Sequence, residues 1–181
     1  PDDVEEVARG FHLLRRLAAD AGATVEGSGE RMAVANLVFQ RQAFTYVSVI
    51  SSFGHRAMAR LNLHLSGWPD AEARRRFLAD ADPQILSGHP TSLAELVDAG
   101  LDGVLHPSVI FSGAMALSAP LRARLERAFG CPVIDVYGLH ETRQIAARVD
   151  DGPFRVLDRR VLVEVLDPRR DEPVPDGEIG E

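Results

Sequence analysis

Residues 109–143 most constrain the fold, because two strand patterns there enclose one helical pattern. Residues 107–111 and 131–136 are apolar runs, typical of strands that are covered on both faces of a parallel sheet. Residues 119–129 between them have helical spacing, with Ser118 as the predicted N-cap. A strand, a helix and a second strand in this order predict an α/β fold with a mostly parallel sheet flanked by helices.

Each of these two strands is followed by a turn of distinctive composition. Residues 112–114 are small, and residues 137–142 supply the aromatic ring of Tyr137 and the carboxylate of Glu141. In open α/β sheets, ligands bind at the carboxyl ends of the strands. Small residues let a flat ligand approach the backbone, while a ring can stack on it and a carboxylate can hold a hard cation. The two turns therefore predict a nucleotide site.

The remaining elements follow from periodicity and turn chemistry. Residues 3–19 form an amphipathic helix that we expect to pack on the protein, with His12 off its apolar stripe as ordinary surface. Apolar runs within residues 32–50 predict strands that are buried on both faces. The further predicted elements are a strand at 60–65, a helix at 71–81 capped by Asp70, a strand at 83–86, and a helix at 93–99 capped by Thr91 or Ser92.

The chain is predicted to be a single α/β domain over residues 1–181. Residues 1–143 form its parallel part, and residues 144–181 form an antiparallel β part because apolar residues alternate there. The last residues are a Pro/Gly/acid-rich loop at which a strand begins, so we expect an incomplete portion of a larger domain.

Composition excludes several classes of function. Hydrophobic residues make up 45% of the chain, yet no apolar run is long enough for a membrane span. A net charge of -7 argues against nucleic acid, which requires clustered positive charge. The one cysteine, Cys131, cannot form an internal disulfide, and without a base placed nearby it is not expected to be a nucleophile. No signal peptide is recognisable, so a cytoplasmic location is the default expectation.

All 20 basic residues are arginine, because the sequence contains no lysine. A Walker-type phosphate loop, which ends in Gly-Lys-Ser/Thr, is therefore excluded from this chain.

The unit SGAMALSAPLRARLERAFGCPVIDVYGLHET resembles the core of acyl-adenylating enzymes, the AMP-binding, acyl-CoA synthetase-like superfamily. The upstream run RRRFLADADPQILSGHPTSLAELVDAG and the downstream run VLVEVLDPRRDEPVPDGEIGE look most like the phenylacetate-CoA ligase branch. The likeness covers residues 31–181. It implies activation of a small carboxylic acid with ATP and Mg²⁺ to acyl-AMP, followed by thioester formation with coenzyme A or the phosphopantetheine of a carrier protein.

The resemblance also implies residue roles. Tyr137 matches the ring that stacks on adenine, and Asp135 matches a group that meets its exocyclic amine. Glu141 matches the magnesium-binding catalytic carboxylate. His140 stands where the family commonly has Thr or Ser, and its imidazole can donate the same hydrogen bond to phosphate. The backbone around the nucleotide is matched by Ser112, Gly113, Ala114, Gly138 and Thr142.

Candidates for binding the acid are Phe53, Gly54 and His89. Phe53 lies near a turn where the family has an aromatic pocket residue, and a place in the core beneath a loop fits it equally well. His89 follows a strand on the expected ligand side of the sheet. The histidine spacings match no zinc pattern, and residues 147–155 lack the Cys and His ligands found in part of the phenylacetate-CoA ligase branch.

Three readings of the function remain open. The superfamily uses a phosphate-loop lysine and a catalytic lysine, and this chain has neither. The first reading is a portion of a ligase that works with the remaining parts of the same enzyme. The second is a non-catalytic nucleotide-binding or interaction module derived from that fold, and the third is a structural α/β fragment.

Overall fold

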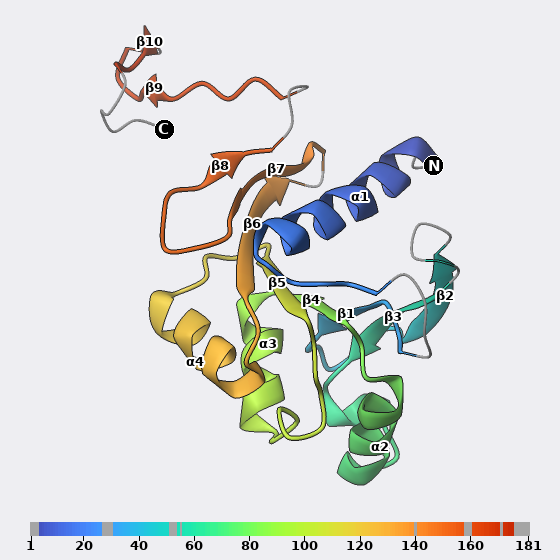
Figure 1. Cartoon of the computed structure of the whole chain (residues 1–181). Coiled ribbons are helices and arrows are strands. Elements are labelled where there is room, and N and C mark those ends of the chain that lie inside the picture. The colour runs from blue at the N-terminus through green and yellow to red at the C-terminus, as the bar shows by residue number, and fades with distance from the viewer. Residues whose placement is uncertain are drawn as a thin grey trace.

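The computed structural model describes residues 4–26, 31–50, 54, 56–139, 141–157, 161–170 and 172–175. Within them, an eight-stranded sheet has the order β2-β3-β1-β4-β5-β6-β7-β8 and carries helices on both faces (Figure 1). A separate two-stranded antiparallel sheet pairs β9 (Leu166–Asp167) with β10 (Glu172–Pro173). The predicted α/β class, with a mostly parallel sheet and an antiparallel region near the C-terminal end, is confirmed.

The centre of the large sheet is parallel. Its strands are β3 (Arg56–Asn62), β1 (Val34–Val38), β4 (Ile85–Gly88), β5 (Val109–Gly113) and β6 (Val133–Leu139). At the far edge, β7 (Arg143–Arg148) and β8 (Arg155–Val156) continue the sheet antiparallel. The antiparallel part is thus joined to the parallel part through β6 and β7.

The expectation that all strands within residues 32–50 are buried on both faces is wrong for β2 (Tyr46–Ile50). Among the described residues, this strand pairs only with β3, and antiparallel to it, so it forms an edge of the sheet. Val47 and Val49 are 55% and 67% exposed. An apolar run therefore marks a strand here without marking burial.

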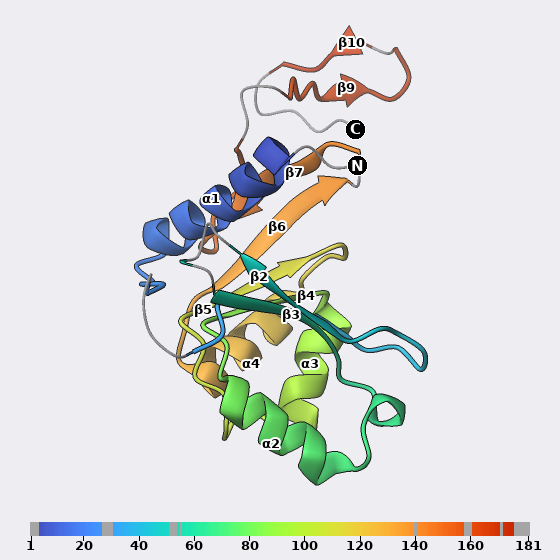
Figure 2. The ribbon, with the colours of Figure 1, turned by 90° about the vertical axis from the view of Figure 1, so that its right-hand side faces the viewer.

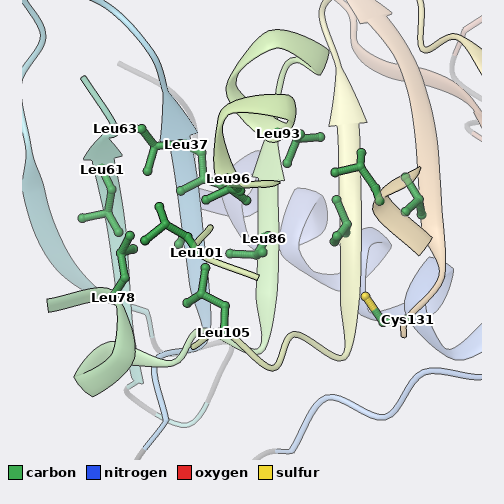
Figure 3. Packing of buried hydrophobic residues seen from close by; sticks show 14 of the residues in the cluster. Leu37, Leu61, Leu63, Leu78, Leu86, Leu93, Leu96, Leu101, Leu105 and Cys131 are labelled. Atoms are coloured by element: carbon green, nitrogen blue, oxygen red, sulfur yellow. The ribbon is translucent and has the colours of Figure 1, made fainter. Parts of the chain in front are cut away.

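Helices α2 (Ala71–Ala81), α3 (Pro90–Asp98) and α4 (Ala119–Phe129) cover one face of the sheet, and α1 (Val4–Asp20) covers the other (Figure 2). The larger core lies under the three helices and is rich in leucine, including the residues labelled in Figure 3: Leu37, Leu61, Leu63, Leu78, Leu86, Leu93, Leu96, Leu101 and Leu105. Burying one such side chain contributes roughly 1.5–3 kcal/mol. The smaller core joins Leu17 and Ala18 of α1 to Val34, Ile85 and Phe111.

Local capping explains most helix starts. The Asp70 Oδ1 accepts from the Ala73 N–H at 2.7 Å, and Ser118 caps α4, both as predicted. The cap predicted for the third helix is wrong. His89 caps α3, because its Nδ1 accepts from the Ser92 N–H at 3.3 Å and Pro90 occupies the first helical turn, where its missing N–H costs nothing.

The strand predicted at residues 60–65 instead runs from Arg56 to Asn62, the bounds of β3. Asn62 is buried, and its amide exchanges hydrogen bonds with the Gln40 backbone, at 2.8 Å to the carbonyl and 3.2 Å from the N–H. The same side chain accepts from the His64 N–H at 3.1 Å, which turns the chain away from the sheet.

Arg122 is buried in α4 and ties that helix to the sheet. Its guanidinium donates to the carbonyl oxygens of Val133 at 2.6 Å, Arg148 at 3.0 Å and Asp150 at 2.5 Å. Val133 begins β6 and Arg148 ends β7. One side chain therefore holds α4 against the two strands that build the site described below.

We expect Arg122→Gln to lower the free energy of unfolding by about 2–4 kcal/mol, because it removes three hydrogen bonds of a buried guanidinium, one of them to a buried carbonyl oxygen. Urea unfolding measures this effect. Arg127→Gln, at an exposed position of the same helix, is the matched control and should change stability by less than about 0.5 kcal/mol. Equal effects of the two substitutions would show that Arg122 does not hold the strands.

Cys131 lies at the end of the larger core, just before β6 (Figure 3). Burial, and to a lesser degree the charge of Glu126, raises the pKa of its thiol from 9.0 to about 12. A thiol of this kind stays protonated near neutrality and is a poor nucleophile. The expectation that Cys131 is not catalytic has a physical basis in this burial.

The raised pKa predicts a pH dependence of stability. The unfolded thiol ionises near pH 9, and the folded thiol only near pH 12. The contribution of the buried thiol to the free energy of unfolding is therefore complete below pH 9 and declines as the pH rises from 9 to 12. We expect urea unfolding to show this decline relative to Cys131→Ala, which lacks the thiol. Iodoacetamide at pH 8 should modify the thiol in urea but not in the folded chain, and equal rates would contradict the burial.

Candidate functional site

The two turns that the sequence marks as ligand-binding lie on neighbouring strands. β5 and β6 pair in parallel, with Gly113 opposite Val136, so that Tyr137 is one residue beyond the level of Gly113. The turn at residues 112–114 and the end of β6 therefore meet at the same edge of the sheet (Figure 1). This is the juxtaposition that the sequence predicts.

Backbone strain is concentrated at this edge. Ala114 has φ 65° and Arg143 has φ 62°, and the described residues contain only one other non-glycine residue with positive φ, Asp82. A left-handed conformation costs a residue with a Cβ roughly 1–2 kcal/mol. Such strain is typical of sites where a backbone must meet a ligand in one geometry.

The expectation that residues 137–142 form a loop is wrong for its first half. Tyr137 and Gly138 belong to β6, which continues to Leu139 and pairs antiparallel with β7. The register shifts between Tyr137 and Gly138, and a Cβ on Gly138 would collide with the backbone carbonyl of Arg143. Only glycine permits this close approach, which brings the hairpin back beside the site.

Tyr137 is 53% exposed, so much of its side chain is open to a flat ligand. Its ring meets Phe154 edge-on, with 6.4 Å between the centroids. The guanidinium of Arg148 lies 5.0 Å from the centre of the Phe154 ring. These contacts support the tyrosine ring from one side.

Asp135 is 4% exposed, and its Oδ2 accepts from Arg148 Nη2 at 2.8 Å. The carboxylate that was predicted to meet adenine therefore already holds a cation. Its cross-strand neighbour in register is Ser112, whose Oγ is buried without a hydrogen-bond partner among the described residues. Buried hydroxyls are normally paired, so the Ser112 Oγ is a group that a bound ligand can satisfy.

Glu141 and Thr142 are exposed on the turn between β6 and β7. The described residues hold no cluster of three His, Cys, Asp or Glu side chains suited to a metal ion. Magnesium in nucleotide sites is commonly held by one or two carboxylates together with phosphate oxygens. The single carboxylate of Glu141 fits that mode.

A cavity of about 780 Å³ adjoins the strand ends, between them and α1. Its lining brings together five predicted site residues: Ser112, Gly113, Ala114, Gly138 and Thr142. Apolar lining comes from both sides, from Leu13, Leu14, Met58, Phe111, Val136 and Leu157. The cavity has the size of a small-molecule site.

Not all predicted residues meet there. His89 caps α3, and neither it nor Gly54 lines the cavity. Phe53 and His140 lie outside the described residues. Tyr137 and Asp135 belong to the strand that borders the cavity but are not among its lining residues.

Sequence reasoning missed the contribution of α1. Arg9, His12 and Arg16 all line the cavity, although the helix was interpreted as packing and His12 as ordinary surface. The signal is their spacing of three and four residues, which places the three side chains along one face of the helix. Leu17 and Ala18 do pack in the core, so α1 has both roles.

No helix among the described residues is both long and apolar enough to cross a membrane.

Comparisons with solved structures give three similar folds. A 2-hydroxyisobutyryl-CoA ligase in complex with 2-HIB-AMP and CoA has a TM-score of 0.56 at 19% identity, over 91% of this chain and 39% of that one. A benzoate CoA ligase from Burkholderia xenovorans LB400 has a TM-score of 0.54 at 21% identity, over 91% of this chain and 35% of that one. MatB from Rhodopseudomonas palustris has a TM-score of 0.54 at 19% identity, over 91% of this chain and 34% of that one. At these identities the likeness shows the fold.

The chain thus spans less than two fifths of the length of these three structures. No curated protein matches it. The sequence profile of the AMP-binding enzyme family matches residues 39–181, which include both turns of the site. The chain belongs to the AMP-binding enzyme family.

Proposed function

We propose that this chain is the nucleotide-holding part of an acyl-adenylating ligase, of the phenylacetate-CoA ligase-like branch. The whole enzyme would join a carboxylic acid to the α-phosphorus of ATP with release of pyrophosphate. The thiol of coenzyme A, or of a carrier-bound phosphopantetheine, would then displace AMP. Family membership and the acyl-AMP described for similar structures support the proposal.

The observation that carries the proposal is the placement of Gly113 and Tyr137 on adjacent parallel strands. An adenine ring would lie between the exposed tyrosine ring and the backbone at Gly113 and Ala114. A Cβ on Gly113 would come within 3.3 Å of the Val136 carbonyl oxygen, a tight contact that glycine avoids. The orphan hydroxyl of Ser112 lies in the same wall.

Charge neutralisation would come from the hairpin turn. Glu141 would hold Mg²⁺, and the ion would neutralise charge on the phosphate oxygens. His140 would donate a hydrogen bond to the α-phosphate in place of the usual hydroxyl, beside Thr142. Adenylyl transfer depends on positioning more than on covalent help from the protein, and the strained Ala114 turn fixes the wall of the site before ligand arrives.

The cavity would hold the acyl group. It lies on the α1 side of the strand ends and shares Gly113, Ala114, Gly138 and Thr142 with the nucleotide wall. An acid bound there would present its carboxylate at the edge where the α-phosphate is expected. Phe53 and Gly54 stay predictions for this pocket, whereas His89 has a capping role that accounts for it.

The absence of lysine favours a second candidate function, a nucleotide-binding module without turnover. Both candidates require AMP binding at Tyr137. They differ in pyrophosphate release from ATP in the presence of an acid, which only the ligase performs.

We expect AMP to bind the chain and Tyr137→Ala to weaken this binding roughly 5- to 150-fold, because stacking on an aromatic ring contributes about 1–3 kcal/mol per base. Isothermal titration measures it. The matched control is Tyr46→Ala, since Tyr46 is the other tyrosine of the chain and is similarly exposed, at 47% against 53%. AMP affinity should not change in the control.

Absence of AMP binding, or equal weakening by both substitutions, would favour a structural fragment. If AMP binds through Tyr137 but the whole enzyme that contains this chain releases no pyrophosphate with any acid in a series of aryl, fatty and dicarboxylic acids, the non-catalytic module is the better reading.

A further inference from the structure

The charge of the cavity lining differs from that of the chain. Carboxylates outnumber basic residues in the sequence, 27 to 20. Among the described residues, the cavity is nevertheless lined by Arg9, His12 and Arg16 of α1 and by Arg143 of β7, and by no Asp or Glu. A hollow with one sign of charge and partly apolar walls concentrates the field and attracts the opposite charge.

Three of these four side chains lie on the α1 side of the cavity. Arg9, His12 and Arg16 share one helix face, while the nucleotide wall at Gly113 and Ala114 comes from the strand ends. Neutral polar groups from Asn36, Ser87 and Gln144 also line the cavity. An acid in this space would therefore reach from the strand edge toward the face of α1 that carries Arg9 and Arg16.

These surroundings do not suit a purely apolar tail. Such a tail would displace water from the guanidinium group of Arg16 without replacing the hydrogen bonds to that water, which is unfavourable. A carboxylate at the same place would accept charge-assisted, bidentate hydrogen bonds from arginine, the geometry that arginine offers best. The site would then discriminate between acids in two ways, by attracting a second carboxylate and by making an apolar tail unfavourable.

We propose that the acid bound in this cavity is a dicarboxylic acid, with one carboxylate at the Ala114 and Thr142 edge and the other on Arg16 of α1. This inference rests on the proposed function and specifies its substrate class. Arg16 is the specificity-determining residue to change, because Arg9 and Arg143 each make a further interaction within the chain. The nucleotide phosphates are the other anion that these cations can attract, and the experiment separates the two.

The test uses glutarate and pentanoate, which have the same carbon chain and differ by one carboxylate. Each is titrated calorimetrically into the AMP-saturated chain. We expect glutarate to bind at least roughly tenfold more tightly, as expected for hydrogen bonds to a charged group. Arg16→Gln should remove most of that difference and leave the pentanoate and AMP affinities unchanged. Arg76→Gln, at an exposed position of α2 outside the cavity, should change the affinity for neither acid.

Each contrary result has a distinct meaning. AMP binding with pentanoate equal to or tighter than glutarate, or with neither acid bound, overturns the dicarboxylate inference and leaves the proposed function standing. Weaker binding of inorganic pyrophosphate in Arg16→Gln, with glutarate unchanged, assigns the cations to phosphate and also overturns it. If the unsubstituted chain binds neither AMP nor either acid, the proposed function itself is wrong.

Discussion

Parallel pairing of β5 with β6 holds the rest of the site in place. The two strands are buried between α4 and α1, so their ends cannot shift relative to one another without opening both cores. Their register fixes Gly113 beside Val136 and sets Tyr137 at the rim. The positive φ of Ala114 just after β5, and the close approach of Gly138 to Arg143 in the β6–β7 hairpin, are local costs at the same edge. Both occur where a ligand would touch the backbone.

The site is coupled to the core through charged side chains. Asp135 holds Arg148, which lies over Phe154, which in turn supports Tyr137. A buried ion pair adds little net stability, but losing one partner is costly because it strands the other charge. The exposed ring is thus positioned by a group buried in the sheet, and Arg122 fixes the same strands from the helix side.

Local signals were readable from the sequence, and long-range ones were not. Ser118 and Asp70 act within their own helices, so their capping roles follow from nearby residues. The exposure of β2 does not follow from nearby residues, because it depends on which strands pair with it. Among the described residues, β2 pairs only with β3. The sequence predicts a loop at Tyr137 because the apolar run ends at Val136, but pairing with β7 extends β6 through Tyr137. That Arg9 and Arg16 line the cavity depends on the position of α1 over the sheet, which periodicity alone does not give.

A crystal structure of the chain with AMP tests the central claim most directly, namely that a purine is held where β5 and β6 end. The expected result is an adenine ring stacked on Tyr137 with its other face against the Gly113 and Ala114 backbone, and with the phosphate near Glu141. Adenine bound elsewhere, with the Tyr137 ring still exposed, would contradict it.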